Sequence, residues 1–315
     1  MSVDKRKAAA SARMCHVIMN SAAGRAHRDR LALALRAGLP RWPVTLHAPA
    51  SPNEMHELIR SIPLHEDLVI AGGDGTLQCA LQALMETQHA VVVLPLGTAN
   101  DFASHWGYTP DVLSLQSALT RRVLRQVDVL SCNGINFTTV GGLGVGAFLT
   151  RDFNKARQFS PLFKRAAEAA GSNIYTALAA GTIIGRRAYL RHYEIESPQG
   201  SFSGLFSNVF ICNQPRLGGN LTVAPNASTS DGCFDILFLK AKTPFDLLRS
   251  LTALRMEVEP ILSERLTTES LLVRASDGRE QLFFADGEAF EMDSVMRFSV
   301  HKGALSLLTA GGSVA

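Results

Sequence analysis

The first third of the chain alternates short apolar runs with segments whose apolar residues recur at helical spacing. In chain order, the pattern predicts strand 16–19, helix 28–37, strand 43–47, helix 52–61, strand 67–71, helix 77–85 and strand 90–94. Ser51 followed by Pro52 is typical of a capped helix start, and Gly38 of a helix end. Strands that alternate with helices indicate a parallel sheet covered on both faces.

From about residue 128 onward, short strand-like runs separated by Gly, Asn, Pro and Ser dominate. The predicted strands are 136–140, 190–195, 206–212, 234–239, 270–274 and 281–284. Helical patterns at 164–184 and 244–256 interrupt them. The run 297–308 has Lys302-Gly303 at its centre and is predicted to form a hairpin. This part of the chain therefore predicts an antiparallel, two-sheet domain.

The composition narrows the class of protein only a little. A chain of 315 residues suits two domains. Its 31 basic and 28 acidic residues leave a net charge of +3, an excess too small to indicate a nucleic-acid binder. No stretch approaches the roughly 20 apolar residues of a spanning helix, and no apolar run follows the basic N-terminus, so no signal peptide is expected. Five scattered cysteines without a CxxC pair predict free thiols in a reducing cytoplasm.

Residues 72–76, Gly-Gly-Asp-Gly-Thr, stand between a buried strand and a helix. The glycines let the backbone approach a ligand, and the helix N-terminus suits phosphate oxygens. Asp74 would repel a bare phosphate unless a metal ion or a sugar hydroxyl lies between them, so it favours a Mg²⁺-nucleotide. The alternative is a tight turn with a capping aspartate. The segment has neither the P-loop lysine nor the glycine spacing of a dinucleotide site.

Residues 95–103, Pro-Leu-Gly-Thr-Ala-Asn-Asp-Phe-Ala, follow the next strand, at the edge where open parallel sheets bind ligands. Gly97 and Thr98 are candidate donors to the same phosphates, and Asn100 and Asp101 are candidates to hold a hydrated Mg²⁺. The alternative is a helix start capped by Asn100 or Asp101, which is compatible with that function.

Asp286-Gly287-Glu288 is a third acidic cluster, behind the apolar run 282–284. Taken alone, it is most simply a hairpin turn. No HExxH zinc motif and no G-x-S-x-G nucleophile elbow accompanies it.

These three segments, in this order, resemble the diacylglycerol-kinase catalytic-domain family, which includes bacterial diacylglycerol kinases, YegS-like lipid kinases, sphingosine kinases and ceramide kinases. The resemblance extends from His16 to Leu308 and includes Asn20 to Gly24 and the segments 224–227 and 231–235. It implies an α/β plus all-β fold, with a doubly wound parallel-sheet nucleotide domain like that of NAD kinases and phosphofructokinases, followed by a β-sandwich. The expected domains are 1–127, joined by a returning segment at about 302–315, and 128–301, which would bind the lipid.

The resemblance also implies roles for individual residues, with ATP as the phosphoryl donor and Mg²⁺ as the metal ion. Glu288 would be the general base that takes the proton of the acceptor hydroxyl, supported by Asp286. Asp74 and Asp101 would organise Mg²⁺. A second, structural metal site would involve Ser228, Asp231 and Cys233. The residues expected to bind the nucleotide are Asn20, Gly72, Gly73, Asp74, Gly75, Thr76, Gly97, Thr98, Asn100 and Asp101.

The chain also departs from the family pattern. Ser21 replaces the usual proline after Asn20, and Gln78 and Cys79 stand where the family often has Asn-Glu. These changes leave the acidic positions Asp74, Asp101 and Glu288 in place.

The leading prediction is an ATP- and Mg²⁺-dependent lipid kinase that converts diacylglycerol to phosphatidic acid. A ceramide or sphingoid-base kinase remains open, as does a non-catalytic nucleotide- or lipid-binding regulator. An NAD-kinase-like metabolite kinase is less favoured. We expect a cytoplasmic protein that contacts membranes peripherally and reversibly, and the sequence is compatible with an oligomer. A basic stretch is a candidate to contact anionic headgroups, and the alternative is a solvated helix face; its residues are Lys155, Arg157, Lys164, Arg165, Arg186, Arg187 and Arg191.

Overall fold

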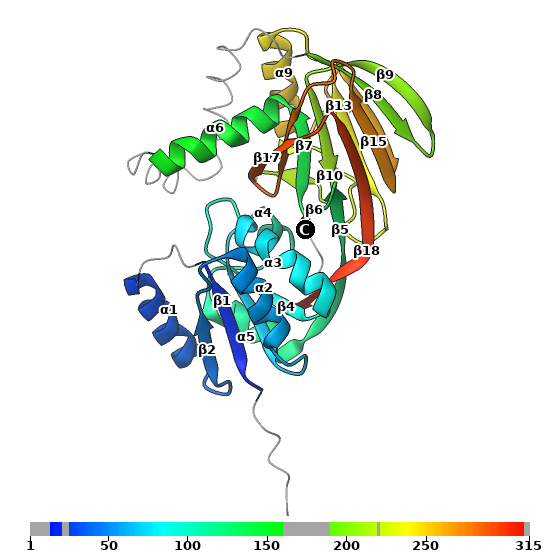
Figure 1. Ribbon diagram of the computed structural model, residues 1–315. Coiled ribbons are helices and arrows are strands. Elements are labelled where there is room, and N and C mark those ends of the chain that lie inside the picture. Colours follow the sequence, from blue (N-terminus) through cyan, green and yellow to red (C-terminus); the bar gives the residue numbers. More distant parts are fainter. Residues whose placement is uncertain (1–12, 21–24, 160–189, 219–220, 312–315) are drawn as a thin grey trace, which may run out of the picture.

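The computed structural model describes residues 13–20, 25–159, 190–218 and 221–311. Figure 1 shows helices around a small sheet in the first half of the chain and a strand-rich second half above it. The predicted helix 164–184 and most of the predicted basic docking residues lie outside the described residues. Among those that are described, no helix is both long and apolar enough to cross a membrane.

The first half contains a parallel sheet in the order β2-β1-β3-β4. Its elements are β1 (Cys15–Met19), α1 (Arg25–Gly38), β2 (Val44–His47), α2 (Pro52–Ser61), β3 (Asp67–Gly72), α3 (Asp74–Thr87) and β4 (Ala90–Pro95). The strand order reverses direction at β1. Because such crossovers are right-handed, α1 covers one face of the sheet and α2 and α3 cover the other. This alternation confirms the predicted α/β half.

Local sequence explains where these helices begin. Ser51 accepts a hydrogen bond from the backbone N–H of Glu54, and Pro52 occupies the first helical turn of α2, as predicted. Beyond β4, the chain forms α4 (Asp101–His105) and α5 (Val112–Arg121), the latter capped by Asp111. It then enters β5 (Val123–Cys132).

The strand β18 (Val295–Thr309) corrects one prediction. We expected residues 297–308 to form a hairpin around Lys302-Gly303, but they form one continuous strand. Both of its halves pair antiparallel with β5, so the chain does not reverse, and the register shifts between His301 and Leu305. Gly303, with φ of +59°, therefore belongs to a bulge and not to a turn.

The second half is a two-sheet antiparallel structure, as predicted. One sheet extends the parallel sheet through β18 to β15 (Ser270–Ala275), β8 (Arg191–Ser197) and β9 (Gly200–Phe206), with β6 (Ile135–Phe137) on β5. The other has the order β14-β13-β10-β7-β16-β17. Its strands are β14 (Ser263–Thr268), β13 (Phe234–Leu239), β10 (Asn208–Cys212), β7 (Val140–Gly144), β16 (Gln281–Ala285) and β17 (Glu288–Met292).

Two helices and a small hairpin complete this half. The helices α6 (Val145–Phe159) and α9 (Pro244–Arg255) share one apolar cluster with the six-stranded sheet, and the hairpin joins β11 (Arg216–Leu217) to β12 (Leu221–Thr222). A second cluster, which includes Tyr193, Phe238 and Phe283, fills the space between the two sheets. Burial of these large side chains supplies the main driving force for the sandwich.

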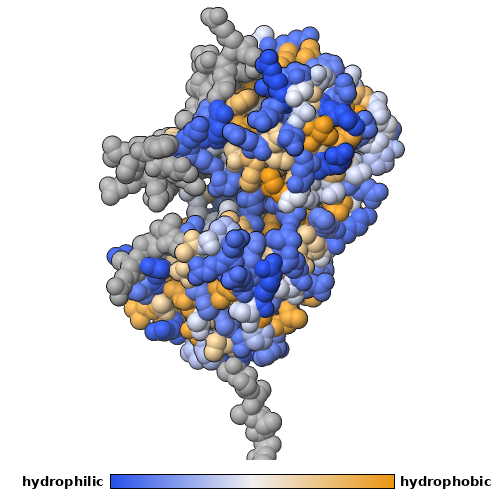
Figure 2. All heavy atoms as spheres, viewed as in Figure 1, coloured by the Kyte–Doolittle hydropathy of each residue, from blue (hydrophilic) through white to orange (hydrophobic). Residues whose placement is uncertain are grey.

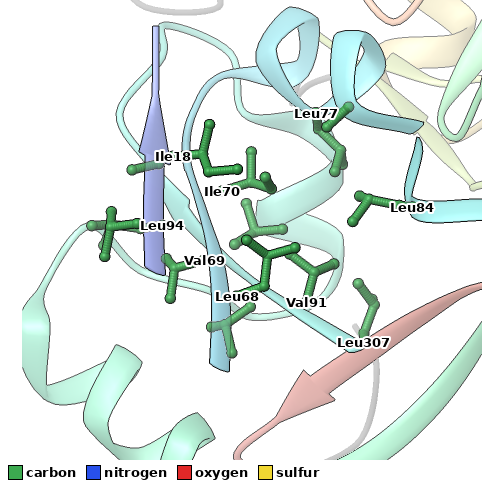
Figure 3. Packing of buried hydrophobic residues seen from close by; sticks show 14 of the residues in the cluster. Ile18, Leu68, Val69, Ile70, Leu77, Leu84, Val91, Leu94 and Leu307 are labelled. Carbon is green, nitrogen blue, oxygen red and sulfur yellow. The ribbon is translucent and has the colours of Figure 1, made fainter. Parts of the chain in front are cut away.

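The core of the first half lies between the parallel strands and their helices. Figure 3 shows Val69, Leu84 and Leu307 among its packed side chains. Val129 belongs to this core and Leu130 to the core of the sandwich, so β5 passes from one core to the other without a break. The domain boundaries at 127/128 and 301/302 stay a prediction, and both lie within continuous strands.

Candidate active site

The predicted phosphate-binding segments meet at the carboxyl edge of the parallel sheet. Asn20 follows β1, the segment 72–76 follows β3 and the segment 95–101 follows β4, and these three strands are neighbours. The edge includes the point where the strand order reverses, which is where such sheets bind ligands. Thr76 and Thr98 lie in these segments, with Thr76 buried in the first turn of α3.

Glycines let the two longer segments touch. A Cβ atom on Gly97 would lie 2.6 Å from the Cα of Gly73, and one on Gly72 would lie 2.3 Å from the Oγ1 of Thr76. The Leu96 N–H also donates to the Gly72 carbonyl at 2.9 Å. A side chain at position 97 would push the two segments apart, and one at position 72 would displace Thr76 from the start of α3, so both positions need glycine.

Asp74 is the first residue of α3, but its carboxylate accepts hydrogen bonds from the start of the next helix, α4. Its two oxygens each accept a hydrogen bond of 3.1 Å, one from the Asp101 N–H and one from the Phe102 N–H at the start of α4. Burial raises the pKa of Asp74, against the lowering effect of these bonds. Asp74 therefore does not cap its own helix, as the capping alternative had it, but accepts N–H groups at the start of α4, and its carboxylate stays at the sheet edge where a ligand would bind.

Asn100 adopts a left-handed conformation with φ of +51° and does not cap α4 with its side chain. Its amide instead bonds both the N–H and the carbonyl of Gly97, each at 2.9 Å. Asp101 reaches the second half of the chain, where its Oδ2 accepts the Gly218 N–H at 2.6 Å. The segment 95–101 is therefore fixed at both of its ends.

Asp286 and Gly287 form the predicted hairpin turn. They connect β16 and β17, which pair Ala285 with Glu288, and both have positive φ, at +47° and +80°. The buried carboxylate of Asp286 accepts bonds from the N–H groups and the hydroxyls of Thr138 and Thr139. Burial raises the pKa of Asp286 to about 6, with a further increase from the charge of Asp74. Asp286 thus holds the turn in place and lies near the glycine segment.

Glu288, the first residue of β17, points to the start of α3. A Cβ atom on Gly75 would lie 3.3 Å from its Oε1. The thiol of Cys79, one turn along α3, has a raised pKa because of burial and of the charge on Glu288. The structure therefore brings Glu288 from the second half of the chain onto the Gly-Gly-Asp-Gly-Thr segment, as the resemblance implied.

Sequence reasoning missed Asn154, on α6. Its Nδ2 donates to Glu288 Oε2 and to the Gly287 carbonyl, both at 3.0 Å. A donor to one carboxylate oxygen fixes the direction of the other, which faces Gly75. No local motif marks this asparagine, because its role depends on how α6 packs on a hairpin more than 130 positions later.

The predicted second metal site does not join this group of residues. Asp231 Oδ1 accepts the Cys233 N–H at 3.0 Å, and Ser228 accepts the Ser230 N–H at 3.3 Å. The segment is anchored by Asp128, a buried residue of β5 whose oxygens accept the N–H groups of Gly232 and Gly303. Within the described part of the chain, no three His, Cys, Asp or Glu side chains form a metal-binding cluster. The second site therefore stays a prediction.

The arrangement at the sheet edge suits transfer of a phosphoryl group. Asp74 and Asp101 offer oxygen ligands of the kind that Mg²⁺ takes from proteins, which supply one or two carboxylates beside nucleotide phosphates and water. The N-terminus of α3 favours phosphate oxygens. Glu288 supplies a carboxylate within the same space.

Comparisons with known proteins identify the class of the chain and its fold. The sequence model of the diacylglycerol kinase catalytic domain matches residues 14–132, and that of the YegS C-terminal NAD kinase beta sandwich-like domain matches residues 165–309. The fold is shared with a putative diacylglycerol kinase from Bacillus anthracis str. Sterne, with a TM-score of 0.73 and 17% identity over 96% of this chain and 98% of that one. The two domain models, together with this fold, define the class of lipid kinases.

Two curated relatives specify the family. A probable YegS-like lipid kinase of Pseudomonas aeruginosa is 30% identical over 78% of this chain and 77% of its own length. The diacylglycerol kinase of Bacillus subtilis is 28% identical over 69% of this chain and 70% of its own. The chain belongs to the family of YegS-like lipid kinases and bacterial diacylglycerol kinases, and it is an enzyme of that family.

Proposed function

We propose that the protein transfers the γ-phosphate of ATP, bound with Mg²⁺, to the hydroxyl of diacylglycerol. The observation that carries this proposal is the position of Glu288, whose carboxylate lies against Gly75 at the start of α3. A carboxylate in this position can accept the proton of an attacking hydroxyl, which suits a general base. The name of the Bacillus subtilis relative supports diacylglycerol as the acceptor.

The donor side would use the backbone of two segments. The phosphates would lie at the N-terminus of α3, beside Gly97 and Thr98, where N–H groups and the helix dipole favour negative charge. Mg²⁺ arrives with ATP and neutralises charge on the phosphates. Asp74 and Asp101 would hold that complex in register, since each is itself fixed by hydrogen bonds to the backbone.

The acceptor side would depend on three residues of the second half. Glu288 would accept the proton of the lipid hydroxyl as oxygen attacks the γ-phosphate. Asn154 would orient the carboxylate, and Asp286 would hold the turn that carries it. Phosphoryl transfer depends mainly on positioning and charge stabilisation, and these proposed roles are of that kind.

Transfer of labelled phosphate tests the proposal directly. The protein is incubated with labelled ATP and Mg²⁺ against detergent-dispersed diacylglycerol, ceramide, sphingosine and phosphatidylglycerol. We expect label in diacylglycerol, and none without Mg²⁺. Label in another lipid but not in diacylglycerol would show that diacylglycerol is not the acceptor. No label in any of the four, with ATP still bound, would contradict the proposal and favour a regulatory protein.

Asn154→Ala should lower kcat about tenfold and move the acidic limb of the rate–pH profile to higher pH. The physical reason is that the Glu288 carboxylate loses a donor that favours its charged form. The measurement is the rate of lipid phosphorylation between pH 5 and pH 9. Asn154→Gln, which retains an amide, should recover part of the loss.

The matched control is Asn136→Ala, which removes a bond of 2.8 Å to Gln82 on the far part of α3. It should leave the profile in place. If Asn154→Ala lowers the yield of folded protein but leaves the pH profile of the folded fraction unchanged, Asn154 has only a structural role.

A further inference from the structure

The residues 240–262, here called the α9 segment, form one excursion from the six-stranded sheet. Leu239 at the end of β13 pairs with Ser263 at the start of β14, and the Lys240 N–H donates to the Leu262 carbonyl at 2.8 Å. The segment therefore leaves and re-enters the sheet at one place and projects α9 between these points. Figure 1 shows α9 at the end of the molecule farthest from the parallel sheet.

One side of α9 is buried and the other carries apolar residues into solvent. Leu247, Ser250 and Leu254 are buried at helical spacing on the six-stranded sheet. The α9 segment nevertheless contains six of the twelve large apolar side chains that are exposed among the described residues. These six are Phe245, Leu248, Met256, Val258, Ile261 and Leu262. Figure 2 shows apolar residues at this end of the molecule.

Such a concentration needs an explanation, because isolated exposed apolar residues are normal but grouped ones mark interaction surfaces. Phe245, Met256 and Ile261 are exposed by 72%, 70% and 76%. The other six exposed apolar residues of the described chain are spread over α1, α5, β5, β9 and the loop before β3.

The charges of the α9 segment fit an anionic partner. Its acidic side chains are engaged by the protein itself. Asp246 closes a capping box with Thr243, Glu259 pairs with Arg265 at 2.8 Å, and Glu257 accepts from Thr222 at 3.1 Å. The basic residues Lys242, Arg249 and Arg255 of the same segment are exposed. Apolar residues flanked by basic ones are typical of helices that lie in a membrane interface.

The segment is also linked to the candidate active site. Glu257, just beyond α9, lies 3.6 Å from Arg216 of β11. Gly218, at the end of β11, donates to Asp101. The hairpin of β11 and β12 therefore connects the end of the α9 segment to the segment 95–101.

We propose that the α9 segment docks onto the surface of a lipid bilayer that carries anionic headgroups, with Phe245 and Ile261 entering the interface. The inference rests on the proposed function, since a lipid acceptor resides in such a bilayer. Vesicle binding needs no turnover, so the two proposals fail separately.

The test compares two double variants in co-sedimentation with phosphatidylcholine vesicles, with and without phosphatidylglycerol. We expect the wild-type protein to bind better when phosphatidylglycerol is present. Phe245→Ser with Ile261→Ser should weaken that binding at least about tenfold, because each side chain loses its transfer from water to the interface. The control is Leu33→Ser with Leu113→Ser, two residues equally exposed on α1 and α5, which should bind as the wild type does.

Activity gives a second readout. The Phe245 and Ile261 double variant should phosphorylate lipid in vesicles more slowly, yet act like the wild type on lipid dispersed in detergent. Vesicle binding equal to that of the wild type would overturn the proposal. It would also be overturned if light scattering showed a wild-type dimer that the variant loses while vesicle binding persists, because the surface would then join two copies of the chain.

Discussion

Glu288→Gln should lower kcat for lipid phosphorylation about a hundred- to ten-thousandfold, the usual contribution of a general base. Glutamine retains the size of the side chain and an oxygen able to accept the Asn154 amide, but it takes no proton from a hydroxyl. ATP affinity should change only a few-fold, since the proposed phosphate contacts come from α3 and from the segment 95–101. The measurements are steady-state transfer to diacylglycerol and the equilibrium binding of ATP.

The chain offers a matched control on the same strand. Glu291 lies three residues further along β17, so its side chain points to the opposite face of the sheet, where it is exposed. Glu291→Gln should leave both kcat and ATP affinity unchanged. A Glu288→Gln variant that keeps more than about a tenth of the wild-type kcat would exclude Glu288 as the base.

Asp74→Ala should have the second-largest effect, a loss of at least about a hundredfold in kcat/KM together with a higher Mg²⁺ requirement. The substitution removes the acceptor for the N–H groups of Asp101 and Phe102, so α4 and the segment 95–101 lose their fixed distance from α3. It also removes an oxygen proposed to hold Mg²⁺ with the nucleotide. The measurement is the transfer rate as a function of ATP and Mg²⁺ concentration.

Asp111→Ala is the control for Asp74→Ala, because it removes hydrogen bonding at a helix start without touching the candidate active site. Asp111 caps α5 by accepting the Ser114 N–H at 2.8 Å, away from the sheet edge. Its loss should lower the melting temperature slightly and leave the Mg²⁺ dependence intact. If the two variants lose similar stability and Asp74→Ala keeps its Mg²⁺ dependence, Asp74 acts as a helix cap alone.

The local parts of the fold could be predicted from sequence because their signals are local. The strands of the parallel sheet are short apolar runs, and Ser51-Pro52 marks the start of α2. The long strand β18 could not be recognised in this way. Lys302-Gly303 is as suitable for a turn as for a bulge, and the pairing of both halves with β5 decides between them. Partners this distant in the chain leave no trace in a window of neighbouring residues.

In the candidate site, too, features with a local sequence signal could be predicted and features that depend on distant contacts could not. The edge formed by the segments 72–76 and 95–101 follows from strand order, and Glu288 was expected there only from the family resemblance. Asn154 and Asp128 escaped notice because their partners are brought from far away by the fold: a carboxylate and a carbonyl for Asn154, and two backbone N–H groups for Asp128. A polar residue whose partners are distant looks like any surface residue in the sequence.

The strand β18 also determines when the protein can finish folding during its synthesis. The final part of this strand pairs with β4 and β5, so the sheet that carries the glycine segment lacks a strand until residue 309 has left the ribosome. The earlier strands must therefore wait with an unpaired edge at β4, where another chain can add.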